Sequence, residues 1–347
     1  MCRGRFTNPN QKETHMHNTT CAPLPATNNR AEWLAQRNEG IGSSDASAIA
    51  GLSTFESPYS LWEIKTGRAP IDPPVDKTTE RLREWGNRLE PVILDATAEE
   101  LGVGIVKPAV GYKSISHDWM RCNLDGWTED GRIFEAKTVH LAQRHKWDGQ
   151  IADHAEIQVT HSAMVTGADR AVVAALIAGS DLRVYEYEIN PRIQEILFDM
   201  EQKFWHCVET DTPPDVDGHA RTIEALTNEW AHTPQPREVG EDEVQDIWDA
   251  WMDADTRKKQ AEHDLNQAKA QLAQLMDGHD SLTTGERVWA RTRRGRLNLK
   301  RLQADQPELV TQYTRPRPVF DMDKFKAEKP GVYTEYQYTS INPVKEN

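Results

Sequence analysis

Two short β-prone segments joined by a turn restrict the fold of this chain more than any other feature of its sequence. The segments run over about 120–128 and 132–139, and Glu129, Asp130 and Gly131 lie between them. Turn-forming residues between two β-prone runs are typical of a β-hairpin. We therefore expect two antiparallel strands here, within a fold that is built around a sheet.

Charged residues occur inside the second segment, where the strand period places them together. Residues i and i+2 of a strand project to the same face, so Glu135 and Lys137 point the same way. Asp125 lies at the end of the partner strand and can reach both. Because the neighbours of these charges are apolar, the strand is expected to be half buried, and a buried charge needs a partner such as a metal ion. The apolar neighbours are Ile133, Phe134, Ala136 and Val139.

Asp125, Glu135 and Lys137 together indicate a specific chemistry. Two carboxylates on adjacent strands supply the oxygen ligands that Mg²⁺ prefers, and phosphate oxygens and water complete its octahedron. A lysine ammonium beside them can hold the attacking water or stabilise negative charge in the transition state. The set predicts metal-assisted hydrolysis of a phosphodiester. The motif by itself leaves open a plain alternative, an exposed ion pair on a strand with an aspartate in the turn.

Helix and strand signals alternate along the rest of the first 210 residues. A helix is expected over about 77–101, where Pro91 should kink or divide it just after Glu90. A second helix is expected over about 153–166, and a second strand pair over 171–178 and 182–189. The order of these elements predicts an α/β fold with a mixed central sheet flanked by helices.

Composition divides the chain into four parts. Residues 1–28 are polar and poor in apolar side chains, so they are expected to be a disordered tail. Residues 29–210 form the expected catalytic domain, and residues 211–240 the expected linker region, which begins with a run rich in Pro and Asp. Residues 241–347 form a C-terminal appendage. It combines a long amphipathic helix over about 244–275, with a coiled-coil-like apolar seam, and a small basic β-segment.

Four blocks of the chain resemble, in order, the lambda-exonuclease-like, YqaJ-type viral recombinase branch of the PD-(D/E)xK nuclease superfamily. The blocks are Trp33–Arg37 with Gly40–Asp45, Trp85–Glu90, Asn123–Gly126 with Glu135–Lys137, and Glu156–Met164. The likeness covers about 33–210. It implies a restriction-endonuclease-like core of the PD-(D/E)xK type. It also implies a phage-type exonuclease that degrades one strand of double-stranded DNA in the 5′-to-3′ direction during recombination.

The resemblance also implies roles for single residues. The catalytic candidates are Glu90, Asp125, Glu135, Lys137 and Gln158. The candidate metal ligands are Asp125, Glu135 and the backbone carbonyl of Ala136, with Glu90 as a further one. The candidates for holding DNA phosphate are Arg37, Ser44 and Arg144. Asp118 resembles a further acidic position at a shortened spacing, and no role follows for it.

Bulk composition limits the partners and the location. The formal net charge of -14 argues against a general basic coat, so DNA contact is expected in a local basic groove. The four cysteines have no metal-site spacing, which argues against a structural zinc or an iron–sulfur cluster. No apolar run approaches the roughly 20 residues of a membrane span, and the N-terminus has no secretory apolar region. We expect no membrane association and a cytoplasmic location, in a bacterium or a phage-infected host.

The expected cofactor is Mg²⁺, with Mn²⁺ as a substitute. The family implies double-stranded DNA and a single-strand annealing protein as partners, and a homo-oligomer such as a trimer. Two alternatives stay open: a restriction-like or repair endonuclease on the same fold, and a non-catalytic DNA-binding or assembly protein. A run of basic residues in the appendage either protects a strand edge or extends the DNA track. These residues are Arg287, Arg291, Arg293, Arg294, Arg296, Lys300 and Arg301.

Overall fold

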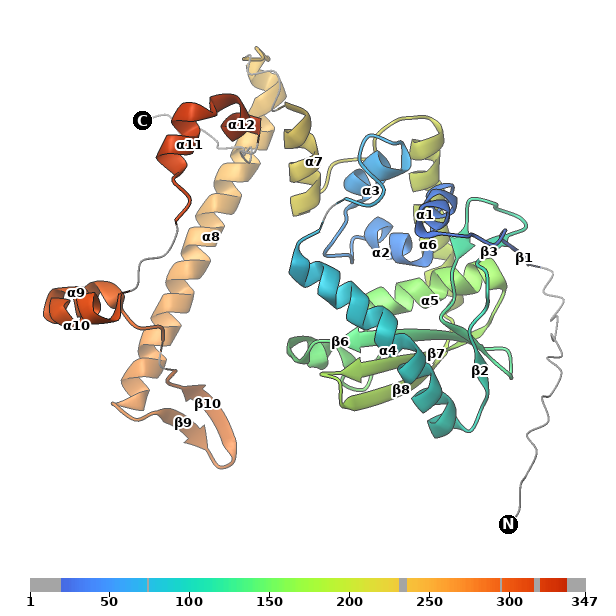
Figure 1. The fold of residues 1–347 in the computed structure, drawn as a ribbon, viewed down its shortest axis with the longest axis horizontal. Helices are drawn as coiled ribbons and strands as arrows, with labels where there is room; N and C mark the ends of the chain where they lie inside the picture. The colour runs from blue at the N-terminus through green and yellow to red at the C-terminus, as the bar shows by residue number, and fades with distance from the viewer. Residues whose placement is uncertain (1–19, 74, 231–235, 294, 315–318, 336–347) are drawn as a thin grey trace. The chain divides into compact units, whose positions relative to one another are not determined.

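The computed structural model describes residues 20–73, 75–230, 236–293, 295–314 and 319–335. The chain divides into two compact units, with the division after Ala231. Figure 1 shows helices packed around a sheet in the first unit, and a long helix with shorter elements in the second.

The first unit combines a sheet with helices on both sides. Its described helices are α1 (Arg30–Asn38), α2 (Ser43–Ile49), α3 (Pro58–Lys65), α4 (Lys77–Leu101), the short 3-10 helix η1 (Leu141–Trp147), α5 (Asp153–Thr166), α6 (Pro191–Glu209) and α7 (Ala220–Trp230). Its described strands are β1 (Cys21–Pro23), β2 (Ile105–Val106), β3 (Tyr112–Ser114), β4 (Arg121–Cys122), β5 (Gly126–Thr128), β6 (Ile133–Val139), β7 (Arg170–Ile177) and β8 (Asp181–Glu188).

Five strands form the central sheet in the order β2-β5-β6-β7-β8. Strand β6 runs parallel to β7 over its whole length, whereas the other neighbouring strands are antiparallel. The sheet is therefore mixed, and the expected α/β fold with a mixed central sheet flanked by helices is confirmed. A separate three-stranded sheet has the order β1-β3-β4.

Helices cover the two faces of the central sheet, α4 on one face and α5 on the other (Figure 1). On the α4 face, Phe134 of β6 packs with Ile93 of α4. On the α5 face, Ile133 of β6 packs with Val159 of α5. A strand covered on both faces has no polar side, which explains the continuous apolar run of β7.

The expected hairpin is confirmed, but its first strand is shorter than the sequence indicates. Residues 120–128 divide into β4, which pairs with β3, and β5, which pairs with β6. The chain changes sheets between them, so Asp125 stands just before β5. Gly126 is needed at this point, because a Cβ there would lie 2.7 Å from Ile105 Cγ2 and 3.2 Å from Phe134 Cδ1.

Helix α4 is continuous from Lys77 to Leu101 although Pro91 lies inside it. Of the two expected outcomes, a kink or a division, the division is therefore excluded. Proline removes one backbone hydrogen bond, but packing on both sides of it holds the two halves on the same sheet face. The residues of α4 that pack there are Leu89, Ile93, Leu94, Ala98 and Leu101.

Residues 20–28 are ordered, which corrects the expectation of a disordered tail over 1–28 for this part of it. Strand β1 pairs with β3, and Leu24 is buried and donates its backbone N–H to the Gly111 carbonyl at 2.8 Å. Strand pairing uses backbone groups, so a polar segment can add to a sheet edge without an apolar pattern. Residues 1–19 lie outside the described residues.

The segment 211–240 was expected to be a linker, but part of it belongs to the first unit. Helix α7 packs on α3: Ala225 lies in the same core cluster as Tyr59 and Trp62, and the Thr222 hydroxyl donates to Ser57 Oγ at 2.7 Å. The compact unit thus extends beyond Thr210 to the end of α7. Composition gave no sign of this, because Pro and Asp mark the turn before α7 rather than the helix itself.

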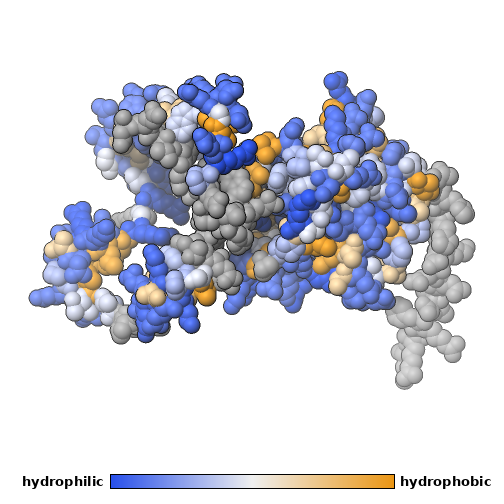
Figure 2. Space-filling view, turned by 90° about the horizontal axis from the view of Figure 1, so that it is seen from above, coloured by the Kyte–Doolittle hydropathy of each residue, from blue (hydrophilic) through white to orange (hydrophobic). Residues whose placement is uncertain are grey.

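The second unit begins with α8 (Glu241–Met276), a helix of 36 residues and therefore about 54 Å long. The other described elements are β9 (Ser281–Thr284), β10 (Arg287–Arg291), α9 (Leu299–Asp305), α10 (Pro307–Tyr313), α11 (Met322–Glu328) and α12 (Pro330–Glu335). Apolar side chains on the face drawn in Figure 2 lie in small groups among hydrophilic ones. Within the described ranges, no helix has the length and apolar character needed to cross a membrane.

Candidate active site

The site forms where β5 and β6 separate. Strand β5 pairs with β6 only at Gly126 and Trp127, so the β5 side of β6 is free of strand pairing beyond Phe134. Asp125 occupies this edge, where its Oδ2 accepts a hydrogen bond from the Ala136 backbone N–H at 2.8 Å. The other side chains of the site lie around this unpaired strand edge and Asp125.

The backbone carbonyl of Ala136 faces the same edge as its amide. In a β-strand, the N–H and C=O of one residue point to the same side of the strand. Because the Ala136 N–H meets Asp125, its carbonyl also points away from β7 and toward the open edge. An acceptor oxygen without a strand partner is thereby placed beside the Asp125 carboxylate.

Lys137 connects β6 to α5. Its ammonium donates hydrogen bonds to the Glu135 carboxylate on the same strand face and to Gln158 Oε1 on α5. The side chain of Glu135 is 12% exposed and that of Lys137 is 22% exposed. Two acceptors from different elements therefore fix the ammonium at the rim of the site.

Glu90 comes from α4, on the opposite side of the sheet from α5. Its carboxylate forms an ion pair with Lys107, a residue just after β2. No sequence pattern marked Lys107, because only the pairing of β2 beside β5 brings this loop to the site. Glu90 is nevertheless close enough to Asp125 and Lys137 to influence the protonation of both.

The site carries excess negative charge. Burial and the neighbouring Glu135 carboxylate raise the pKa of Asp125 to about 7, with a further contribution from Glu90. Burial lowers the pKa of the Lys137 ammonium, but Glu135, Asp125 and Glu90 more than offset this, so the pKa is raised. Lys137 is therefore a cation and a hydrogen-bond donor at neutral pH, not a base.

A divalent cation fits this donor set. Asp125, Glu135 and the Ala136 carbonyl offer oxygen atoms, the ligand type of Mg²⁺. In the absence of metal, burial and the Glu135 carboxylate raise the pKa of Asp125, and Lys137 does not offset them, so a bound cation would favour the ionised carboxylate. Among the described residues, no three His, Cys, Asp or Glu side chains already stand at metal-binding distance from one another. One reason is that two of the carboxylates already form ion pairs, Glu135 with Lys137 and Glu90 with Lys107.

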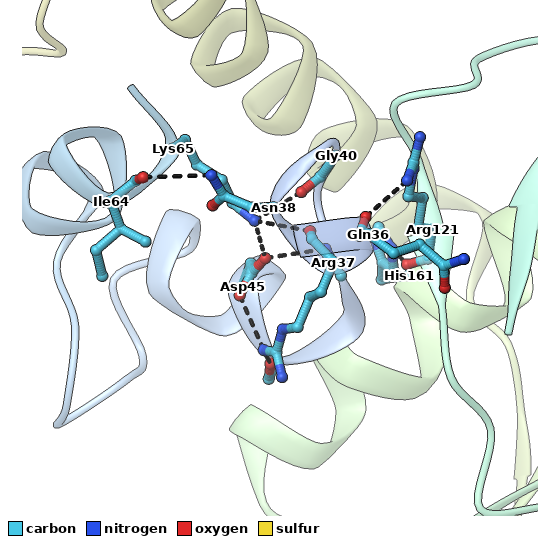
Figure 3. Close-up of polar contacts among 11 residues, drawn as sticks. Gln36, Arg37, Asn38, Gly40, Asp45, Ile64, Lys65, Arg121 and His161 are labelled. Atoms are coloured by element: carbon cyan, nitrogen blue, oxygen red, sulfur yellow. Dashed lines mark hydrogen bonds and ion pairs between the residues drawn. The ribbon is translucent and has the colours of Figure 1, made fainter. Parts of the chain in front are cut away.

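A second polar cluster surrounds Arg37 at the end of α1. Figure 3 shows Arg37, Asp45 and Lys65 pointing toward one another. The Arg37 guanidinium donates to Ser44 Oγ and lies 3.1 Å from Asp45 Oδ1. The Lys65 ammonium donates to Asp45 Oδ2 at 2.7 Å and to the Gly40 carbonyl at 2.6 Å.

The charges of this cluster leave Arg37 available to a ligand. Burial raises the pKa of Asp45, but Lys65 and Arg37 more than offset this and hold the pKa of that carboxyl well below its usual range. Lys65 is almost fully buried, with 3% of its side chain exposed, whereas Arg37 is 33% exposed. Two cations thus share one buried carboxylate, and the outer one reaches solvent. Lys65 had no marker in the sequence.

The two serines at the start of helix α2 do not cap it. Gly42, not Ser43 or Ser44, is its N-cap, and the Asp45 side chain accepts the Gly42 backbone N–H at 3.1 Å. The serine hydroxyls are consequently not used as caps. Ser43 Oγ lies 2.8 Å from Ser162 Oγ of α5, and Ser44 Oγ meets Arg37.

Helix α5 joins the two clusters. Gln158 and Ser162 are four residues apart, so they are neighbours on one face of this helix. Gln158 contacts Lys137, and Ser162 contacts Ser43 at the start of α2. Two residues of α5 one helical turn apart therefore contact Lys137 and the start of α2, the helix that also contributes Ser44 and Asp45 to the Arg37 cluster.

Arg144 is not brought to either cluster. It lies in η1, its side chain is 54% exposed, and its guanidinium is 3.5 Å from Asp181 Oδ2. Asp118 is exposed and uses its backbone carbonyl to accept from Arg121 at 3.3 Å. The structure thus assembles Asp125, Glu135, Lys137 and Gln158, with Glu90 nearby, and leaves Arg144 and Asp118 outside.

Comparison with known proteins finds one family in this part of the chain. Residues 32–169 match the model of the YqaJ-like viral recombinase domain. Protein YqaJ of Bacillus subtilis (strain 168), itself uncharacterised, is 27% identical over 215 residues. That match covers 60% of this chain and 66% of the relative, just under two thirds of the relative's length.

Solved structures of one enzyme are also similar. The alkaline exonuclease LHK-Exo from Laribacter hongkongensis is 14% identical, with a TM-score of 0.45, over 58% of this chain and 98% of that one. The same exonuclease in complex with dAMP gives 13% identity and a TM-score of 0.44 over the same shares.

Proposed function

From the match of residues 32–169 to the YqaJ-like viral recombinase domain, we propose that the protein is a metal-dependent DNA nuclease. The observation that carries the proposal is the group at the β5–β6 edge. A protonated lysine, a bound glutamate and a buried aspartate meet there beside a free backbone carbonyl. Such a group suits the hydrolysis of a phosphodiester.

Asp125, Glu135 and the Ala136 carbonyl would hold Mg²⁺, or Mn²⁺ in its place, with Glu90 as a further ligand. When bound, the ion supplies positive charge for the phosphate oxygens and lowers the pKa of a bound water. Lys137 donates hydrogen bonds to the oxygen that gains negative charge, because its own pKa is raised and it keeps its protons. Gln158 fixes the direction of that ammonium.

We further propose that the Arg37 cluster binds a phosphate of the same DNA. Arg37 is tied to Ser44 and Asp45 on one side and reaches solvent on the other. A phosphate dianion at a strand end is a better partner for a guanidinium than an internal diester with one charge. Helix α5 contacts both Lys137 and the start of α2, next to Ser44 and Asp45. Binding of a terminal phosphate favours an exonuclease that acts on double-stranded DNA ends, and the family resemblance implies the 5′-to-3′ direction.

Digestion of linear and covalently closed duplex DNA tests the proposal. With Mg²⁺, the protein should degrade linear duplex and leave closed circles intact, and a chelator should stop the reaction. Lys137→Ala should lower the rate by orders of magnitude while DNA binding is kept, because the loss is in the transition state. Lys203→Ala, an exposed lysine on α6, is the matched control. Undiminished digestion by Lys137→Ala would refute the assignment, and ready cutting of closed circles would favour the endonuclease alternative.

The phosphate role is tested with duplexes that carry or lack a 5′-phosphate. Wild-type protein should degrade the phosphorylated duplex faster, and Arg37→Gln should remove that difference. Arg30→Gln is the matched control, since Arg30 lies on the same helix and pairs with Asp72 at the surface. Equal rates on both ends in the wild type would contradict a terminal phosphate at Arg37.

A further inference from the structure

The second unit contains a concentration of positive charge that the proposed nuclease site does not use. Residues 281–301 hold seven Lys and Arg residues and one acidic residue, Glu286, in a chain of net charge -14. Six of the seven are described and exposed, and Arg294 lies outside the described residues. The six are Arg287, Arg291, Arg293, Arg296, Lys300 and Arg301.

A β-hairpin supports the first part of this charge. Strands β9 and β10 pair antiparallel from Ser281↔Arg291 to Thr284↔Arg287, at the C-terminal end of α8 (Figure 1). Gly285 in the turn has φ +59°, a conformation that favours glycine. At the base of the hairpin, the Thr292 backbone N–H donates to the Asp280 carbonyl at 2.7 Å. Arg293 therefore follows directly on a closed hairpin rather than on a free chain.

Trp289 is held on this hairpin in a fixed orientation. It lies at a bulge between Val288 and Ala290, and its indole N–H donates to Thr284 Oγ1 at 2.6 Å. The Arg287 guanidinium carbon stacks 3.5 Å from the centre of the indole ring. Trp289 as a residue is nevertheless 52% exposed. An ordered and half-exposed aromatic ring beside cations is the usual platform for stacking a nucleobase.

Ordinary structural roles do not account for the charge. Arginine on an edge strand can block strand addition, which would explain Arg287 and Arg291. Arg293 and Arg296 lie outside the strands. Lys300 and Arg301 lie in the first turn of α9, where the helix dipole favours acidic side chains instead.

The pairing of these cations also differs from that on α8. Arg257 and Lys259 on α8 pair with Asp253 at 3.2 Å and with Asp255 at 2.8 Å. In the hairpin region, Arg301 lies 3.4 Å from Asp305. Within the described parts of the chain, Arg291, Arg293 and Arg296 have no carboxylate at ion-pair distance. Their guanidinium groups are available to an external anion.

We propose that this basic hairpin surface, made of Arg287, Trp289, Arg291, Arg293 and Arg296, binds single-stranded DNA. Phosphates would meet the arginines, and a base would stack on Trp289. A single strand is favoured over a duplex because its bases are free to leave their neighbours and expose a face to the indole. The proposal goes beyond the proposed nuclease function, which needs no such site, although a nuclease that removes one strand would produce this ligand.

Binding of a labelled 30-nucleotide oligothymidine to the full chain tests the proposal. The Lys137→Ala background with chelator keeps the DNA intact, so the measurement does not depend on whether the protein is a nuclease. Arg291→Gln with Arg293→Gln should weaken binding and reduce the slope of log affinity against log salt by about 1.4, since two phosphate contacts are lost. Trp289→Leu should weaken binding about tenfold, and Trp289→Phe should retain most of it.

Arg257→Gln with Lys259→Gln is the matched control, because it removes the same charge from the same unit at sites that are already paired. This control should bind like the parent protein. Equal oligothymidine affinity in the hairpin variants and the control would overturn the proposal. So would a loss confined to a blunt 30-base-pair duplex, which would show that the surface contacts double-stranded DNA instead.

Discussion

Asp125→Asn should stabilise the metal-free protein while it destroys the site. In the folded protein, burial and Glu135 raise the pKa of Asp125 from 3.8 to about 7. Above pH 7 the carboxylate is ionised in both folded and unfolded chains, but it is ionised at a cost only in the folded one. The shift corresponds to about 4 kcal/mol at about 1.4 kcal/mol per pKa unit. Asparagine can still accept the Ala136 N–H and carries no charge.

The sign of the pH dependence follows from the raised pKa. Between pH 4 and 7 the folded chain keeps a proton that the unfolded chain releases, so stability falls as the pH rises through this window. The gain from Asp125→Asn should therefore be about 1 to 2 kcal/mol at pH 5 and about 4 kcal/mol at pH 8. Below pH 4 the stability gain from Asp125→Asn should vanish, because Asp125 is protonated in both the folded and the unfolded chain.

Urea denaturation with chelator, followed by tryptophan fluorescence at pH 5 and pH 8, measures this gain. Asp169→Asn is the control, since the Asp169 side chain is 88% exposed and its loss should change stability by less than about 0.5 kcal/mol. Added Mg²⁺ should stabilise the wild type and not the Asp125→Asn variant. An Asp125→Asn protein that is equally or less stable at pH 8 would refute the reasoning that burial and the Glu135 carboxylate make the ionised form of Asp125 costly in the folded protein.

Three further predictions concern the frame of the first unit. Gly126→Ala should cost about 1–3 kcal/mol and lower activity, because its Cβ would lie 2.7 Å from Ile105 Cγ2; an unchanged melting temperature would contradict this. His161 and Glu201 are fully buried 2.8 Å apart; burial lowers the pKa of His161, but Glu201 more than offsets this and the pKa is raised. Glu201→Gln should therefore lower the free energy of unfolding by about 3–5 kcal/mol at pH 6. This stability difference between wild type and variant should narrow as the pH rises through the raised His161 pKa, because the wild type then loses the stability of the ion pair. A difference that stays constant with pH would argue against the ion pair. A chain that ends at Thr210 should melt at a lower temperature than one that ends at Trp230, because it loses α7 and its contact with Ser57; equal melting temperatures would show that α7 is dispensable.

The sequence by itself determined the elements with strong local signals. Stop glycines at the ends of α4 and α5 and turn residues between β7 and β8 predicted these elements, since such signals act within a few residues. The strand period put Glu135 and Lys137 on one face. The family likeness named the remaining catalytic candidates, and the structure brings Gln158 to Lys137.

Only the tertiary structure decided which distant groups meet. Lys107 pairs with Glu90, and Lys65 with Asp45, because strands and helices far apart in the chain pack together. Local sequence patterns do not predict such contacts between distant residues. The short strand β1 and the helix α7 were missed for a related reason: backbone pairing and the burial of a few side chains against an existing core stabilise them, and neither leaves a periodic pattern.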